Sequence, residues 1–162
     1  MFPGSFDPFT VGHYDIVVRA LDLFDRVIIA IGENNTKQPV FPPDERMERI
    51  RKAFANEERV EVVSYSDLTV DLAQRVGAQF IVRGVRDTRD FEYERSIAEA
   101  NKQLSHIETI LLYTRPEYAH VSSTLVRRKR LVTEIVTVVF IWFFVILVVS
   151  RSSLWWAWIY WL

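Results

Sequence analysis

The residues with the clearest chemical potential lie at the start of the chain, in Phe2-Pro-Gly-Ser-Phe-Asp-Pro-Phe-Thr-Val-Gly-His13. Thr10 and His13 are three residues apart, and the segment 14–24 that follows has apolar residues at helical spacing. A Gly-Ser turn before such a helix is a suitable cradle for phosphate, because backbone N–H groups and the positive end of the helix dipole point at the anion. The simpler interpretation is a strand-to-helix turn in which His13 makes a local hydrogen bond.

This stretch resembles the entry motif of the nucleotidyltransferase superfamily, in the Thr-x-Gly-His form found in the bacterial phosphopantetheine adenylyltransferases. Three further blocks resemble that family in the same order, and four ordered blocks are more specific than one. The blocks are Thr36-Lys37, Arg83-Gly84-Val85-Arg86 with Asp90-Phe91-Glu92-Tyr93-Glu94, and Val121-Ser122-Ser123-Thr124-Leu125-Val126-Arg127. The resemblance covers residue 2 to about residue 127.

The resemblance implies adenylyl transfer, in which the phosphate of 4′-phosphopantetheine attacks the α-phosphorus of ATP and gives dephospho-coenzyme A and pyrophosphate. A phosphate monoester is already a nucleophile, so the chain needs only to align two polyanions and donate to the charge on the five-coordinate phosphorus. Mg²⁺ is expected to be held mainly by the ATP phosphates, and no residue is expected to be a metal ligand.

The resemblance also implies a role for individual residues. The catalytic residues would be His13, Lys37 and Arg83, and 4′-phosphopantetheine would be bound by Ser5, Lys37, Thr69 and Arg83. ATP would be bound by Ser5, Phe6, His13, Gly84, Val85, Arg86, Glu94, Tyr118, Ala119, His120, Val121, Ser122, Ser123 and Thr124. Lys37 and Glu94 also fit solvated surface positions, and the Ser-Ser-Thr run also fits a helix cap.

The elements that must position these residues alternate between strands and helices through residues 1–130. Strands are predicted at 26–32, 60–65, 79–83 and 108–112, and helices at 43–54, 70–76, 90–104 and 122–127. This pattern predicts an α/β fold, a Rossmann-like parallel sheet with helices on both faces, whose ligands bind beyond the carboxyl ends of the strands. The first strand is truncated to Met1 and Phe2, which should expose backbone groups of its neighbours.

Composition adds few constraints on function. The chain has 162 residues, a net charge of −1 and no cysteine, which argues against a nucleic-acid partner, a disulfide framework and a thiolate metal site. The first residues do not form a secretory signal, so a cytoplasmic enzyme is expected. The resemblance adds a homo-oligomer, specifically a hexamer.

An abrupt change of composition near residue 130 predicts two parts, a nucleotidyltransferase domain at 1–130 and a hydrophobic, Trp-rich tail at 131–162. All five Trp lie in the tail, whose charged residues are Glu134 and Arg151. Its uncharged run 135–149 is shorter than the roughly 17 residues that a membrane span requires, although the basic residues 127–130 and the Trp residues suit an anchor. The change favours a frameshift-like origin of the tail over membrane contact.

Two alternative functions remain open. The first is a related nucleotidyltransferase with another phosphate acceptor, such as nicotinamide mononucleotide or glycerol phosphate. The Thr10-x-x-His13 form, Lys37 and the Arg83 block argue against it. The second is a non-catalytic, membrane-associated chain defined by its tail.

Overall fold

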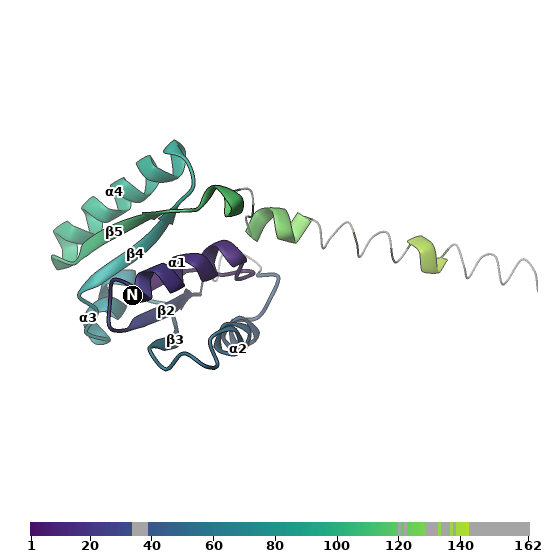
Figure 1. Cartoon of the computed structure of the whole chain (residues 1–162), viewed down its shortest axis with the longest axis horizontal. Coiled ribbons are helices and arrows are strands. Elements are labelled where there is room, and N and C mark those ends of the chain that lie inside the picture. The colour runs from purple at the N-terminus through teal and green to yellow at the C-terminus, as the bar shows by residue number, and fades with distance from the viewer. Residues whose placement is uncertain are drawn as a thin grey trace, which may run out of the picture. The chain divides into compact units, whose positions relative to one another are not determined.

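The computed structural model describes residues 1–33, 39–119, 121, 123–128, 133, 137 and 139–142, and the chain forms two compact units, Met1–Ser123 and Thr124–Leu162. The strands of the first unit are β1 (Phe2–Gly4), β2 (Val27–Gly32), β3 (Val60–Tyr65), β4 (Phe80–Val85) and β5 (Glu108–Tyr113) (Figure 1). Its helices are α1 (Val11–Leu21), α2 (Pro43–Ala53), α3 (Thr69–Arg75), α4 (Thr88–Ser105) and the 3₁₀ helix η1 (Pro116–Tyr118).

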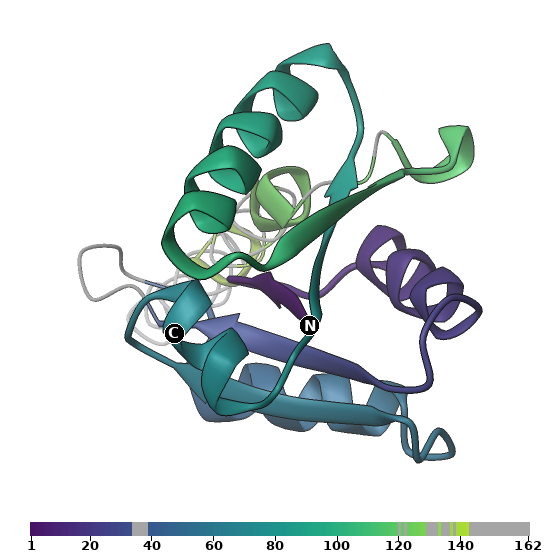
Figure 2. The same cartoon turned by 90° about the vertical axis from the view of Figure 1, so that its left-hand side faces the viewer.

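The strands are parallel wherever they pair. β2 pairs with β1 on one side and β3 on the other, and β4 pairs with β5. Met1 joins these two groups, because its amino group donates to the Phe80 carbonyl at 2.7 Å and its own carbonyl accepts from the Val82 N–H at 2.8 Å. The two sheets, β3-β2-β1 and β4-β5, therefore adjoin at Met1 in the order β3-β2-β1-β4-β5, and because the paired strands are parallel their carboxyl ends lie on the same side. Figure 2 shows α4 lying beside β4 and β5.

The alternation of side chains along β2 builds a core on each face of the sheet. Val27, Ile29 and Ile31 belong to a cluster with residues of α1 and α2, whereas Ile28 and Ala30 belong to a second cluster with residues of α3. α4 packs against α3, β4 and β5. A strand buried on both faces carries a continuous apolar sequence, which is the pattern of this segment. The predicted α/β fold with helices on both faces is confirmed.

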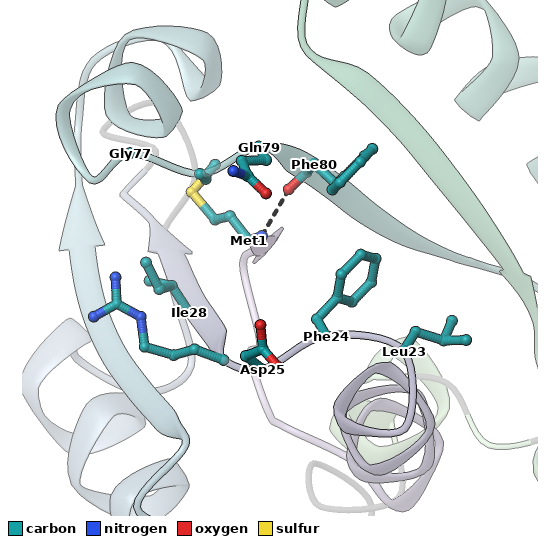
Figure 3. Close-up of a pocket in the computed structure, with 10 residues that line it drawn as sticks. Met1, Leu23, Phe24, Asp25, Ile28, Gly77, Gln79 and Phe80 are labelled. Atoms are coloured by element: carbon teal, nitrogen blue, oxygen red, sulfur yellow. Dashed lines mark hydrogen bonds between the residues drawn. The ribbon is translucent and has the colours of Figure 1, made fainter.

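The first strand is short, as predicted: β1 has 3 residues, whereas β2 has 6. A cavity of about 550 Å³ lies at the amino end of β1, and Met1, Ile28 and Phe80 are among the residues that line it (Figure 3). From Phe2 onward the strand pairs with β2.

The predicted elements agree with the structure within a few residues at their ends. α1 opens between Thr10 and His13 and ends at Leu21 rather than Phe24, and α4 begins at Thr88 rather than Asp90. Residues 123–128 are helical, as the last block predicted.

The second unit is described at only part of its length. Residues 133, 137 and 139–142 are helical, and Phe140 and Trp142 are exposed. Within the described part of the chain, no helix has the length and apolar character needed to cross a membrane. Glu134 and Arg151 lie outside the described residues, and the division at residue 130 stays a prediction.

Candidate active site

The turn after β1 carries Ser5 and Phe6 and folds back over itself. Phe6 has φ 45°, in the left-handed region, and its ring lies over Gly4. A Cβ on Gly4 would be 2.8 Å from the Phe6 ring, so a residue without a side chain is required there. The buried Phe6 ring also contacts the rings of Phe2 and His13, with centroids 5.1 and 5.2 Å away, and Ser5 is left exposed.

His13 lies in the first turn of α1, and the structure explains why it is three residues from Thr10. Thr10 is the N-cap residue, and its backbone N–H donates to Nδ1 of His13 at 3.0 Å. A bond between the side chain of the third helical residue and the backbone of the N-cap is one of the two bonds of a capping box. Because Nδ1 accepts, the proton of the neutral imidazole is on Nε2, which is left as a donor.

The surroundings of His13 keep its imidazole uncharged near neutral pH. Burial among aromatic rings, together with the smaller effect of the positive charges of Arg86 and Arg83, lowers the pKa of His13 to about 4. Desolvation and like charge both disfavour the imidazolium. The site therefore combines a neutral N–H donor at a helix N-terminus with two nearby guanidinium groups.

Two buried charged residues that the sequence analysis did not select hold the turn in place. Asp7 accepts from the backbone N–H of Val40 at 2.9 Å and of Phe41 at 3.0 Å. Arg46, on the buried side of α2, donates to the carbonyl of Ser5. The end of the segment between β2 and α2 is thereby fixed beside the turn. Arg46 precedes the buried Ile50 by one helical turn, which was the available sequence signal.

Lys37 and Thr36 belong to that same segment and lie outside the described residues. Their predicted contribution to the site stays a prediction. Thr69, the first residue of α3, bonds through its hydroxyl to the Tyr65 hydroxyl at 2.9 Å, at the carboxyl end of β3. Its position at the shared edge of the sheet fits the predicted acceptor pocket.

Arg83 lies at the carboxyl half of β4 and is held by three hydrogen bonds. Nε donates to Oε2 of Glu94 at 2.7 Å and Nη2 donates to Oε1 at 2.6 Å, while Nη1 donates to the carbonyl of Pro3. Glu94 is buried on α4. The bidentate pair joins β4 to α4, and the third bond joins it to β1.

The two residues after Arg83 act through backbone and packing. A Cβ on Gly84 would lie 3.3 Å from Cγ1 of Ile16, so glycine allows α1 to pack closely on β4. Val85 is buried, and its carbonyl accepts from the N–H of Thr114 at 2.8 Å. Any contact of either residue with a ligand would be made by its backbone.

Arg86 begins the segment that leads into α4. Its Nε donates to Oδ2 of Asp90 at 2.7 Å, and this bond raises the pKa of Arg86. Asp87 caps the helix, with Oδ1 accepting from the N–H of Asp90 at 2.9 Å. The first turn of α4 therefore fixes the orientation of the exposed Arg86 side chain.

The last block meets the start of α1. A Cβ on Gly12 would be 3.8 Å from Cβ of Tyr118, and the Ser123 hydroxyl donates to the carbonyl of Pro8 at 2.9 Å. Ala119 is exposed, and the N–H of Val121 donates to the Tyr118 carbonyl at 2.9 Å. His120 and Ser122 lie outside the described residues, and Thr124 belongs to the second unit.

A further ion-pair group ties α1 to the end of β5. Asp15, which is buried on α1, lies 3.3 Å from Nε of Arg115 and 3.4 Å from Nη1 of Arg19. Arg19 also donates to the carbonyl of Tyr113 at 2.6 Å. The sequence of this part of α1 indicates only an apolar helical face, because Arg115 and Tyr113 lie far away along the chain.

The fold and the site define a domain of the nucleotidyltransferase class, and the chain belongs to the cytidylyltransferase-like family, which matches residues 1–129. Within this family it belongs with the phosphopantetheine adenylyltransferases, as the motifs predicted. The phosphopantetheine adenylyltransferase of Bacteroides fragilis is 55% identical over 127 residues, covering 78% of this chain and 85% of the relative. That of Phocaeicola vulgatus is 54% identical over 127 residues, covering 78% and 84%.

Solved structures support the fold at much lower identity. The crystal structure of the lipopolysaccharide core biosynthesis protein from Thermoplasma volcanium matches with a TM-score of 0.52 and 19% identity, covering 71% of this chain and 93% of that one. A protein with unknown function from Archaeoglobus fulgidus matches with a TM-score of 0.51 and 17% identity, covering 69% and 95%. Similarity at this level concerns the architecture.

Proposed function

We propose that the chain transfers the adenylyl group of ATP to 4′-phosphopantetheine, giving dephospho-coenzyme A and pyrophosphate. The observation that carries this proposal is the state of His13, a neutral Nε2–H donor at the N-terminus of α1 with Arg83 and Arg86 close enough to lower its pKa. The names of relatives that are about half identical over 127 residues specify the acceptor.

In the proposed reaction, a phosphate oxygen of 4′-phosphopantetheine forms a bond to the α-phosphorus of ATP. The bond from that phosphorus to the bridging oxygen of pyrophosphate breaks, and pyrophosphate leaves with the electron pair. His13 donates from Nε2 to an α-phosphate oxygen, where charge grows in the transition state. A donor that stays neutral keeps its proton throughout, so no proton transfer to or from His13 is required.

The two ligands divide the edge of the sheet between them. Arg83 at β4, Ser5 at β1 and Thr69 at the start of α3 would bind the acceptor, together with Lys37. The turn at Phe6, the backbone at Gly84 and Val85, and Arg86 would bind ATP. The last block would bind its outer phosphates through residues 118–124, and the contact of Ser123 with Pro8 and of Tyr118 with Gly12 supports a position beside α1.

Magnesium in this proposal enters with the nucleotide. Among the described residues, no three carboxylate, imidazole or thiol groups gather where they could hold a metal ion. The donors at the site are N–H groups and hydroxyls, which suit phosphate oxygens rather than Mg²⁺. The ATP phosphates would supply the ligands, and the ion would neutralise part of their charge. A cytoplasmic location and a hexamer stay predictions.

Comparison of acceptors in a pyrophosphate-release assay tests the proposal. The full chain should release pyrophosphate from ATP with 4′-phosphopantetheine, and much more slowly with nicotinamide mononucleotide or glycerol phosphate. Mass spectrometry should identify dephospho-coenzyme A as the product. Preference for either other acceptor would assign the chain to a related transferase, and release with none of them would remove the proposed function.

A further inference from the structure

Arg46 carries a buried positive charge, which distinguishes it from the other basic residues of α2. The residue is 4% exposed, and its Nε is buried without a hydrogen-bond partner among the described residues. By contrast, Arg49 pairs with Glu45 and Lys52 pairs with Glu48 on the exposed side of the helix. In the part of the chain that the structure describes, no carboxylate forms an ion pair with Arg46, and a charge buried in this way is costly. Its position therefore needs a reason other than stability.

The local sequence gives Arg46 no acidic neighbour on its own face of the helix. The positions three and four residues before it are prolines, and those three and four residues after it are Arg49 and Ile50. Its guanidinium instead extends away from the helix, and Nη1 donates to the carbonyl of Ser5 in the turn after β1. The buried charge therefore lies beside the turn that the proposed function assigns to phosphate binding.

The bond from Arg46 fixes the direction of the peptide group between Ser5 and Phe6. This peptide is trans, so its N–H points away from its carbonyl, and the Phe6 N–H is directed away from Arg46. The ring of Phe6 packs on those of Phe2 and His13, which holds the residue at its left-handed φ of 45°. Within the described ranges the Phe6 N–H makes no hydrogen bond. It is therefore an available donor with a fixed direction.

A cation at the carbonyl also strengthens the N–H at the other end of the same peptide group. Hydrogen bonds that share a group polarise one another, and the effect is stronger where little water has access. A polarised backbone N–H is the kind of donor that stabilises negative charge on a phosphate. An anion at the turn would in return compensate the buried charge of Arg46.

We propose that Arg46 is a positioning residue, which holds and polarises the Ser5–Phe6 peptide group so that the Phe6 N–H donates to a phosphate of ATP. This inference rests on the proposed function, in which the turn at Phe6 binds the nucleotide, and it adds a residue that acts through the backbone of that turn. It follows that loss of Arg46 weakens phosphate binding at the turn.

Binding of pyrophosphate, the proposed leaving group, tests this inference without turnover. Pyrophosphate should raise the Tm of the full chain, because a ligand that binds only the folded state stabilises it. The dissociation constant obtained from this response should be about 10-fold weaker in Arg46→Met, which keeps an unbranched side chain but removes the charge and the donor. No response of the unmodified chain would exclude a phosphate site at the turn and overturn the proposal.

Arg51→Met is the matched control for this measurement. Arg51 lies on the same helix and also donates to a backbone carbonyl, that of Val62 at 3.2 Å, but it is exposed. Its replacement should leave the response to pyrophosphate unchanged. A lower Tm of the free Arg46→Met chain together with an unchanged response would show a merely structural role and would overturn the proposal.

Two further variants separate the charge of Arg46 from its hydrogen bond, and they replace Arg46→Met if that variant does not fold. Arg46→Lys keeps the charge, whereas Arg46→Gln keeps a neutral N–H donor. Lysine should preserve more of the affinity for pyrophosphate than glutamine does. Full affinity in Arg46→Gln would contradict polarisation by the buried charge.

Steady-state kinetics locate the effect within the site. KM for ATP should rise about 10-fold in Arg46→Met, whereas KM for 4′-phosphopantetheine should change less than threefold, because Arg46 contacts the carbonyl of Ser5 and not its hydroxyl. A rise in KM for the acceptor alone would overturn the proposal.

The backbone amide signal of Phe6 in a ¹H–¹⁵N spectrum keeps the inference separate from the proposed function. Loss of the polarising charge should move this signal upfield in Arg46→Met, and the signal should stay in place in Arg51→Met. An unmoved signal in Arg46→Met would overturn the positioning role whatever the activity. A moved signal and a weakened response to pyrophosphate in a chain without turnover would overturn only the function.

Discussion

The turn after β1 and the segment after β4 reach the same edge of the sheet, but they are held in different ways. The turn is surrounded by aromatic rings and fixed by buried bonds to backbone groups, from Asp7 and Arg46. The segment after β4 is fixed by ion pairs, in which Arg83 meets Glu94 and Arg86 meets Asp90.

The two regions differ in the charge of their donors. Apolar surroundings keep His13 neutral, whereas the guanidinium groups of the second region carry a positive charge in any protein environment. The arginines in turn disfavour a charge on His13, so the second region reinforces the state that the first imposes. One edge of the sheet thus presents both a neutral and a cationic hydrogen-bond donor.

The largest expected effect is that of His13→Ala on turnover. Loss of a donor to the growing transition-state charge should cost about 2.7–4 kcal/mol of barrier, or a factor of roughly 10²–10³ in kcat. Pyrophosphate release measures it. His106→Asn removes the other described imidazole, at the left-handed C-cap of α4 before β5, and should keep full activity. A loss of less than threefold in His13→Ala would remove His13 from the chemistry.

Asp7→Ala should weaken the turn itself. Its removal takes away the two hydrogen bonds from the N–H groups of Val40 and Phe41, and loss of a buried hydrogen-bond partner costs about 1–3 kcal/mol. Urea unfolding followed by far-UV circular dichroism measures the loss, because all five Trp lie in the tail and would not report on the turn. Asp25→Ala, at an exposed position, should change stability by less than about 0.5 kcal/mol. Equal effects of the two substitutions would contradict the role given to Asp7.

The neutral state of His13 predicts a pH dependence of stability. The pKa is about 4 in the folded chain against 6.5 for an unperturbed histidine, so below pH 6.5 the unfolded chain binds a proton that the folded chain does not. Stability should therefore fall as the pH is lowered from 6.5 to 4, by at most about 1.4 kcal/mol per pH unit for this group. Unfolding of His13→Gln at the same pH values isolates its contribution. A His13 ring that titrates near 6.5 by NMR would exclude this account.

The smallest expected effect is that of Ser123→Ala, which removes the bond to the carbonyl of Pro8. A typical hydrogen bond contributes about 0.5–1.5 kcal/mol, and here its loss should also raise KM for ATP. Ser105→Ala removes a comparable bond, to the carbonyl of Asn101 at 2.8 Å, near the opposite edge of the sheet. It should lower stability by a similar amount without changing KM. Identical kinetics of the two variants would show that the last block does not contribute to ATP binding.

The strands and helices were predictable because their signals are local. The apolar run of β2 and the helical spacing of α2 each lie within one element, and both were found with nearly correct ends. The buried bonds that fix the site are not local. Asp7 meets Val40 at a separation of 33 residues and Arg46 meets Ser5 at 41, so no periodicity within an element reveals them.

Glycine shows a different limit of the sequence. Gly84 was predicted to bind ATP, which favours a small residue because the ligand must approach the backbone, and the structure adds the packing of Ile16 as a second reason for a small residue. Both reasons select the same residue type, so the sequence cannot distinguish between them. The same holds for Glu94. Its sequence fits both an exposed and a buried position, and only the position of Arg83 in the fold decides between them.

The α-amino group of Met1 makes a hydrogen bond inside the fold, to the carbonyl of Phe80. Its bond to Phe80 and the cavity beside it mean that anything joined to this nitrogen begins next to β4, in a space lined by Ile28 and Phe80. An affinity tag fused at this position would therefore continue the sequence of β1. A tag with alternating apolar residues and a tag made of glycine and serine should therefore affect the fold differently.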